Sequence, residues 1–245
     1  MVVRTLLIWP VMIVLTGICA AMLALLSALR PDSPWIERII RIWSGTGLRL
    51  AGVRLEVKGV ERLAPGQAYV FVANHISVLD IFTHFYGLPV PVRFLAKKEL
   101  FRIPILAQGL RAIGTVEVDR KGGPTALDRV NAQARKAIAR GHSLIVYAEG
   151  TRSRDGELQR FKSGAFVIAA ATGLEVVPTT IHGTRQVMKA DSLWVKGGKV
   201  TLVIDEPISA AGLDRSGVVR LGRQTREIIA SRYDELRGLE AMPQS

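Results

Sequence analysis

Residues 74–80, NHISVLD, decide the fold, because they join an apolar run to a helix-forming segment and carry polar side chains at the junction. The apolar run at residues 69–73 is typical of a buried strand. Residues 81–86, which follow, can begin a helix. In open α/β sheets, ligands bind where strands end. We therefore expect a functional site around His75.

His75 and Asp80 are spaced for acid–base chemistry. A carboxylate that accepts a hydrogen bond from one imidazole nitrogen fixes the tautomer and makes the other nitrogen a better base. Such a pair suits removal of a proton from a substrate hydroxyl. Ser77 and Asp80 also fit a capping box, in which Asp80 only secures a helix start and His75 is an ordinary loop residue. The two interpretations are compatible, since a cap can also aim the carboxylate at His75.

The chain has 245 residues, a formal net charge of +12 and 49% hydrophobic residues. This length allows one sizeable α/β domain plus an additional segment. The positive charge suits anionic partners, which include nucleic acid, anionic lipid headgroups and phosphorylated substrates. The single cysteine, Cys19, excludes an intrachain disulfide and a cysteine-based zinc cluster.

An uncharged apolar run covers residues 5–29, between Arg4 and Arg30. It can span a bilayer with some tilt, or enter one leaflet as a hairpin that bends at Pro10 or Gly17. It is too long for a cleaved signal peptide. More arginine follows the run than precedes it, so the positive-inside rule places the rest of the chain on the cytoplasmic face of the cell (inner) membrane.

Residues 35–43 form an amphipathic segment after the break at residues 31–34. Its tryptophans, isoleucines and arginines suit a helix at the level of the lipid headgroups, and the same pattern also suits a core-facing helix. We expect residues 1–50 to form membrane-anchoring helices that are not required for folding of a body at residues 51–245.

The body alternates strands with helices. Strands are expected at residues 53–58, 69–73, 92–96, 115–118, 143–148, 176–182 and 200–204, and helices at 125–140, 163–172 and 217–236. This alternation predicts an α/β fold with a mainly parallel sheet flanked by helices.

Basic residues and a glycine follow several of the predicted strands, and these are Lys97, Lys98, Arg120, Gly150, Arg152, Arg154 and Lys162. Arginine offers a planar fork of donors that matches phosphate oxygens. A glycine lets backbone N–H groups approach an anion closely. Each charge taken alone is typical of a solvated surface. Together, beside His75 and Asp80, they predict a phosphate-binding site.

Four segments of the chain resemble sequence blocks of the glycerolipid acyltransferases. In chain order they are Asn74-His75 with Asp80, residues 114–120, residues 149–152 and Val177-Pro178. Their order and spacing are similar to those of the 1-acylglycerol-3-phosphate acyltransferases, over about residues 53–204. Glu117 departs from the pattern, because a less polar residue is common there.

The resemblance implies transfer of an acyl group from a thioester of coenzyme A or acyl carrier protein to the sn-2 hydroxyl of lysophosphatidic acid, which gives phosphatidic acid. His75 would be the general base and Asp80 would orient it, with no covalent acyl-enzyme, no metal and no cofactor. Arg120 and Arg152 would hold the phosphate. The other residues that the resemblance places around the substrate are Asn74, Lys97, Gly114, Glu149, Gly150, Thr151, Lys162 and Pro178.

Other functions remain open at this point. The acceptor could be a lyso-ornithine lipid or another lysophospholipid, which the four blocks do not separate. A membrane-tethered binder of anionic lipid or nucleic acid would also explain the charge, although 6% aromatic residues and the lack of a nucleic-acid module argue against nucleic acid. A serine hydrolase would need a Gly-x-Ser-x-Gly elbow, which the sequence lacks.

Overall fold

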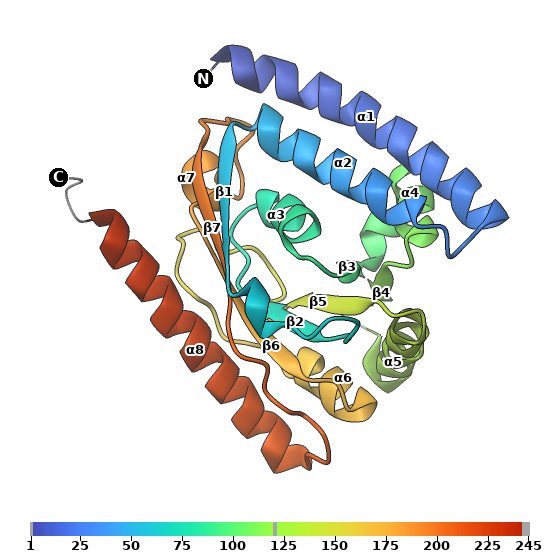
Figure 1. Ribbon diagram of the computed structural model, residues 1–245, viewed down its shortest axis with the longest axis vertical. Helices are drawn as coiled ribbons and strands as arrows, with labels where there is room; N and C mark the ends of the chain where they lie inside the picture. The colour runs from blue at the N-terminus through green and yellow to red at the C-terminus, as the bar shows by residue number, and fades with distance from the viewer. Residues whose placement is uncertain (1, 120–121, 242–245) are drawn as a thin grey trace.

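A computed structural model describes residues 2–119 and 122–241 (Figure 1). Its helices are α1 (Val2–Leu29), α2 (Trp35–Leu50), α3 (Leu79–Gly87), α4 (Leu106–Ala112), α5 (Gly123–Ala139), α6 (Gly164–Thr172), α7 (Thr184–Val187) and α8 (Arg215–Ala241). Its strands are β1 (Val53–Lys58), β2 (Val70–Ala73), β3 (Val92–Lys97), β4 (Val116–Val118), β5 (Ser143–Tyr147), β6 (Val176–His182) and β7 (Gly198–Ile204). Short 3₁₀ helices follow two strands, η1 (Val60–Arg62) and η2 (Lys98–Arg102).

The seven strands form one sheet in the order β1-β7-β6-β2-β5-β3-β4. The five strands from β6 to β4 are mutually parallel. Strand β7 pairs antiparallel to β6, and β1 pairs parallel to β7. The predicted α/β class with a mainly parallel sheet is confirmed, and β1 and β6 have the predicted bounds.

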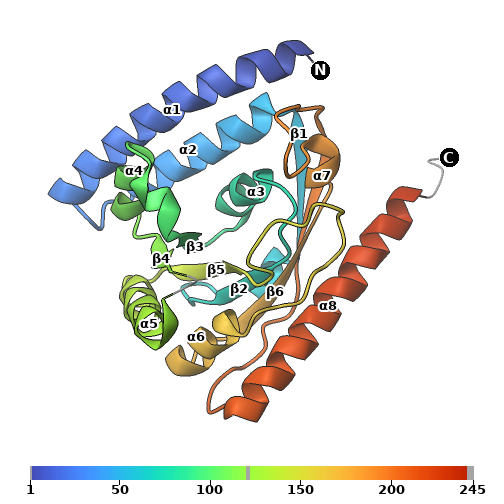
Figure 2. The ribbon, with the colours of Figure 1, turned by 180° about the vertical axis from the view of Figure 1, so that it is seen from behind.

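Helices cover both faces of the sheet, as Figures 1 and 2 show from opposite sides. Helices α1, α2 and α3 lie on one face, and α5, α6 and α8 lie on the other. Side chains alternate between the faces along each strand. In β2, Phe71 joins the core under α1–α3, whereas Val70 and Val72 join the core under α5, α6 and α8. Burial on both faces explains why the central strands are almost wholly apolar.

Helix α2 is a core element as well as a surface one. Ile36, Ile39 and Ile40 on one side of it are buried. The ring of Trp43 stacks on Phe82 of α3 with centroids 4.4 Å apart. Its glycines allow this approach, because a Cβ at Gly47 would lie 2.6 Å from the Phe82 ring. The core-facing interpretation of residues 35–43 therefore holds for this side of α2.

Helix α1 lies along the body instead of extending away from it. Its Ile8, Met12 and Leu23 are buried in the core that α2 and α3 share. Hydrogen bonds tie it down at Trp9, whose Nε1 donates to Leu193 O (2.9 Å), and at Thr16, whose Oγ1 accepts from Trp43 Nε1 (2.9 Å). Among the described residues it is the one helix long and apolar enough to cross a membrane, judged by length and composition.

This packing crosses the predicted boundary at residue 50, and whether residues 1–50 are dispensable for folding stays a prediction that the following experiment tests. Deletion of residues 1–50 should abolish the cooperative thermal transition, because truncation of even one buried Phe or Trp side chain costs about 3–5 kcal/mol of a stability of about 5–15 kcal/mol. Circular dichroism in detergent checks this, with full-length Leu6→Gln, on the exposed side of α1, as the control. A cooperative transition of residues 51–245 near that of the full chain would contradict it.

Candidate active site

The carboxyl ends of the parallel strands meet at one edge of the sheet. Ala73 at the end of β2 lies opposite Tyr147 at the end of β5. The segments that follow these strands are joined, because Glu149 Oε1 accepts a hydrogen bond from the backbone N–H of His75 (2.8 Å). The structure thus brings together two of the sequence blocks, which are separated by more than 70 residues.

His75 and Asp80 form a hydrogen-bonded pair at this edge. The distance from His75 Nδ1 to Asp80 Oδ2 is 2.8 Å, and the Asp80 side chain is fully buried. A carboxylate oxygen accepts hydrogen bonds and does not donate them. Nδ1 of His75 therefore carries the proton, and Nε2 has the free lone pair. The imidazole keeps 15% of its surface exposed, so Nε2 can receive a proton from a bound hydroxyl.

Asp80 also serves as a helix cap. Its Oδ2 accepts from the backbone N–H groups of Ile76 (2.7 Å) and Ser77 (2.8 Å), and the Ser77 hydroxyl accepts from Leu79 N (3.3 Å). The bond from Ser77 N to Asp80 is one half of a capping box, whereas the Ser77 hydroxyl bonds to Leu79 N and not to Asp80 N. The second oxygen of Asp80, Oδ1, accepts from Thr184 Oγ1 (2.6 Å). One carboxylate therefore bonds both to the start of α3 and to His75, and these bonds fix its direction toward the imidazole.

The ring of Tyr147 packs against the imidazole of His75. Its ring stacks on the His75 ring with centroids 3.9 Å apart and planes 10° from parallel. Its hydroxyl lies 3.1 Å from Nδ1 of His84, which in turn is 3.0 Å from the backbone carbonyl of Asp80. Burial lowers the pKa of His84 to about 4 and raises the pKa of Tyr147 well above its usual value, so both are neutral at pH 7.

Removal of the Tyr147 ring should lower turnover, because the imidazole loses the surface that fixes its plane and that favours the imidazolium. Tyr147→Leu should lower kcat by about 10-fold, as expected for about 1 kcal/mol of ring contact plus misalignment of the base. Tyr147→Phe keeps the stack and should stay within about threefold of wild type. Steady-state kinetics of the two variants tests this, and equal losses would contradict the role of the ring face.

Asn74 and Glu149 hold the backbone of the site in place. The Asn74 amide both donates to Ile181 O (2.9 Å) and accepts from Ile181 N (2.8 Å), which ties the end of β2 to β6. Glu149 accepts from His75 N and from Gln159 N (3.0 Å). Burial raises the pKa of the Glu149 carboxyl. Both side chains are buried and fix the backbone around His75, and the substrate contact that the resemblance implied for them stays a prediction.

Gly150, Arg152 and Lys162 stand together after β5. Gly150 has a φ of +75°, and its missing side chain leaves room for the Lys162 ammonium, which lies 2.8 Å from where a Cβ would stand. Arg152 is half-buried, with Nη1 donating to Ala190 O (2.7 Å). Thr151 between them is exposed. These residues follow Glu149 in the chain, and their binding of a phosphate stays a prediction.

The remaining predicted residues are more dispersed. Lys97 is exposed at the carboxyl end of β3, on the same edge as His75. Arg120 lies outside the described residues. Gly114 precedes β4 and therefore lies at the opposite edge of the sheet, near Arg93, which places it away from His75. Pro178 is buried within β6 opposite Val72, and its predicted role around the substrate stays a prediction.

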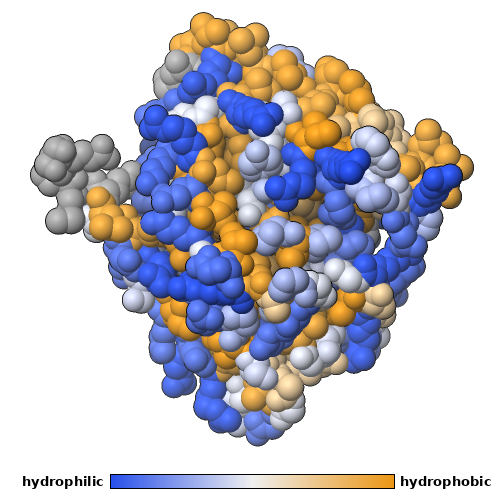
Figure 3. Space-filling view, viewed as in Figure 1, coloured by the Kyte–Doolittle hydropathy of each residue, from blue (hydrophilic) through white to orange (hydrophobic). Residues whose placement is uncertain are grey.

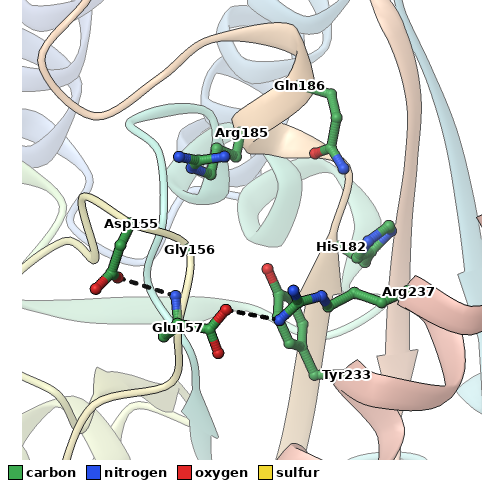
Figure 4. A pocket seen from close by; sticks show the side chains of 8 residues that line it. All are labelled: Asp155, Gly156, Glu157, His182, Arg185, Gln186, Tyr233 and Arg237. Carbon is green, nitrogen blue, oxygen red and sulfur yellow. Dashed lines mark hydrogen bonds and ion pairs between the residues drawn. The ribbon is translucent and has the colours of Figure 1, made fainter.

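A cavity of about 290 Å³ lies on the α8 side of this edge (Figure 4). Its walls are Asp155, Gly156, Glu157, His182, Arg185, Gln186, Tyr233 and Arg237. Glu157 and Arg237 form an ion pair across it (2.9 Å). Of the described residues predicted to bind substrate, none lines this cavity.

The sequence alone did not point to Tyr147, His84 or Thr184. Tyr147 is the last residue of a strand that reads as apolar, and only its position before Glu149 could have drawn attention to it. His84 lies four residues after Asp80, which is the spacing of one helical turn and was a usable signal. Thr184 is 104 residues from Asp80 in the chain, and no local sequence pattern predicts their contact.

Comparisons with known proteins agree with this geometry. The family model described as Acyltransferase matches residues 54–182. The chloroplastic 1-acyl-sn-glycerol-3-phosphate acyltransferase LPAT1 of Arabidopsis thaliana is 33% identical over 72% of this chain and 49% of its own. The 1-acyl-sn-glycerol-3-phosphate acyltransferase of Borreliella burgdorferi is 27% identical over 78% of this chain and 76% of its own. The chain thus spans about half the length of LPAT1 and of the Brassica napus relative BAT2.

A solved structure shares the fold. The crystal structure of the 1-acyl-sn-glycerophosphate (LPA) acyltransferase PlsC from Thermotoga maritima superposes with a TM-score of 0.72, at 24% identity, over 95% of this chain and 98% of that one. The family match extends from β1 to the end of β6 and includes the paired His75 and Asp80. Because this match covers more than half of its residues, the chain belongs to the Acyltransferase family.

Proposed function

We propose that the chain transfers an acyl group from a thioester to the sn-2 hydroxyl of lysophosphatidic acid and makes phosphatidic acid for phospholipid biosynthesis. The observation that carries the proposal is the His75–Asp80 pair, in which the Asp80 side chain is fully buried and the His75 side chain keeps 15% of its surface exposed. The names of the relatives support this choice of acceptor.

The geometry supports a direct transfer. Nε2 of His75 takes the proton of the acceptor hydroxyl while its oxygen attacks the thioester carbonyl carbon. Asp80 stabilises the imidazolium that forms, because its carboxylate lies 2.8 Å from Nδ1. Collapse of the tetrahedral intermediate breaks the carbon–sulfur bond, and the imidazolium returns its proton to the leaving thiolate. The products are the ester and the free thiol.

This chemistry calls for no metal and no cofactor, since the thioester is already an activated acyl donor. The donor is acyl-CoA or acyl-acyl carrier protein, which share the phosphopantetheine thioester. The reaction involves lipid partners and no nucleic acid. The neutral Tyr147 beneath His75 adds a contact that favours the imidazolium once the proton has moved.

The phosphate of the acceptor would lie beside Arg152, Lys162 and Lys97, with Arg120 as a further proposed contact. Arg152→Ala should raise the KM for lysophosphatidic acid by about 10- to 150-fold, because a hydrogen bond to a charged group is worth about 1.5–3 kcal/mol. Lysine at this position should rescue only partly, since a point charge does not reproduce the guanidinium fork. Kinetics with monoacylglycerol, which lacks the phosphate, is the control. Equal losses on both acceptors would show that Arg152 is structural.

The position of α1 favours attachment to one leaflet of the inner membrane, with the body on the cytoplasmic face. Arg4 and Trp9 donate hydrogen bonds to the body, and Thr16 accepts one from Trp43 of α2, so the first half of α1 is held against the rest of the chain. Its outward side carries large exposed apolar residues, among them Leu6, Ile13 and Leu25. A helix fixed in this way presents its apolar side to the membrane surface without leaving the body, and the acceptor and product are themselves membrane lipids.

The test is a product assay with purified full-length protein. Lysophosphatidic acid and an acyl thioester, supplied either as acyl-CoA or as acyl-acyl carrier protein, should yield phosphatidic acid and free thiol in equal amounts. Mass spectrometry identifies the lipid and a thiol reagent counts the leaving group. Release of thiol with free fatty acid as the only acyl product would show hydrolysis and overturn the proposal.

A further inference from the structure

Two loops of the α/β body expose apolar side chains beside α1. The Ile105 loop (residues 100–105) exposes Ile103 and Ile105, which keep 47% and 56% of their surface. It leads into α4, whose Gly109 lies against Ala20 of α1, since a Cβ added at Gly109 would stand 3.0 Å from the Ala20 Cβ. The Trp194 loop (residues 189–196) exposes Leu193 (67%) and Trp194 (50%). Both loops come from the body and extend the apolar side of α1.

The Ile105 loop holds its isoleucine in a strained backbone. Ile105 has φ 69° and ψ −56°, and it is the only residue other than glycine with a positive φ in the described part of the chain. A β-branched residue there costs about 1–3 kcal/mol, and such strain clusters at functional segments. The side chain it presents is exposed, so contacts within the body do not explain its presence.

The Trp194 loop is fixed against the N-terminal part of α1. Trp9 Nε1 donates to Leu193 O (2.9 Å), Arg4 Nη1 donates to Lys196 O (2.7 Å), and the hydroxyl of Thr5 accepts from Val195 N (3.1 Å). Three bonds to consecutive turns keep this loop beside α1. If α1 rests on a membrane, Leu193 and Trp194 therefore lie at its surface as well.

The charge and composition of the Ile105 and Trp194 loops indicate what kind of partner they contact. Exposed basic residues accompany the apolar ones, with Arg102 next to Ile103 and with Lys189 and Lys196 on either side of Leu193. Tryptophan and aliphatic residues interleaved with lysine and arginine suit the headgroup layer of an anionic bilayer. In Figure 3 the apolar colour gathers along the side of the molecule where Figure 1 shows α1.

We propose that the Ile105 loop and the Trp194 loop enter the headgroup layer of the same anionic leaflet as α1, so that the body itself contacts lipid at two points. The inference rests on the membrane location in the proposed function, and it does not depend on the acceptor. Each loop is connected to the site, since the Ile105 loop follows Lys97 and Lys98 closely and the Trp194 loop accepts a hydrogen bond from Arg152 at Ala190 O (2.7 Å). Lipid contact at both loops sets the phosphate-binding residues at the depth of an acceptor headgroup.

Fluorescent labelling tests the contact directly, because Cys19 is the single cysteine of the chain. In a full-length Cys19→Ala background, an environment-sensitive fluorophore is attached at Ile103→Cys, at Trp194→Cys and, as a matched control, at Val219→Cys. Val219 is 56% exposed on α8, across the sheet from α1 (Figure 1). The labels are compared in detergent and in vesicles of phosphatidylcholine with phosphatidylglycerol, with brominated lipid as quencher.

In vesicles, the labels at residues 103 and 194 should shift to shorter wavelength and be quenched, while the label at residue 219 does not change. Labels at 103 and 194 that behave like the control, in protein that sediments with the vesicles, would overturn the proposal. A shift that depends on protein concentration without lipid would overturn it in favour of a second copy of the chain. This readout needs no turnover, so failure of the proposed acyl transfer leaves it interpretable.

A kinetic experiment separates lipid contact from a structural role. The double variant Leu193→Gln/Trp194→Gln should raise the KM for lysophosphatidic acid in vesicles by about 10-fold, as loss of about one buried apolar side chain predicts. The KM for a short-chain, water-soluble lysophosphatidic acid should not change. An equal rise for both acceptors would show that the loop acts on the site and not on the lipid.

Discussion

Replacement of His75 by alanine should lower kcat/KM by about 100- to 10,000-fold, which is the usual cost of removing a general base. The fold should persist, because Asp80 keeps its hydrogen bonds from Ile76, Ser77 and Thr184. The thermal transition of the variant should therefore stay close to that of wild type. Initial rates and thermal melts on the same preparations give both quantities.

A second histidine provides the control for this substitution. His142 lies at the opposite edge of the sheet, where Arg93 Nη2 donates to its Nε2 (2.8 Å). His142→Gln keeps an acceptor for Arg93 and should retain wild-type turnover. A folded His75→Ala protein with near-wild-type turnover would rule out the proposed mechanism.

Replacement of Asp80 by asparagine should cost about 1,000- to 10,000-fold in turnover while the structure persists. An asparagine oxygen in the place of Oδ2 accepts the same bonds from His75, Ile76 and Ser77. Its NH₂ group then faces the Thr184 hydroxyl, which is able to accept a hydrogen bond. The hydrogen bonds are kept and the charge that steadies the imidazolium is lost.

Ser77→Ala is the complementary variant, because it removes part of the helix cap and leaves the carboxylate. It should cost about 1 kcal/mol of stability with little change in turnover. Thermal melts and initial rates of the two variants separate the roles of Asp80. If Asp80→Asn loses stability and keeps turnover, Asp80 acts only as a cap.

Local patterns predicted most elements of the fold. Strand β6 matches its predicted bounds because a glycine with left-handed backbone precedes it, Gly173, and another follows it, Gly183. The reversal of β7 against β6 has no such signal, since the alternation that predicts a strand carries no direction. The amphipathic pattern of α2 fits both a membrane surface and a core, and only the contact between Trp43 and Phe82 decides for the core side.

The site likewise has features that local sequence predicts and contacts that it does not predict. His75, Ser77 and Asp80 lie close together in the sequence. Their spacing was enough to predict the His75–Asp80 pair and the bonds of Asp80 to the helix start. The contacts that hold the pair come from distant strands, as with Asn74 to Ile181 and Asp80 to Thr184. Gly114 shows the limit of a matched block, because a block can span a whole strand and place its first residue at the far edge of the sheet.

The choice of acceptor is the central claim, and one measurement tests it most directly. The value of kcat/KM for purified full-length protein is determined with lysophosphatidic acid, a lyso-ornithine lipid and monoacylglycerol as acceptors, with the same thioester donor. Recognition of the phosphate by charge-assisted bonds predicts a preference for lysophosphatidic acid of about 10-fold or more over both others. An equal or higher value for the lyso-ornithine lipid or for monoacylglycerol would contradict the account.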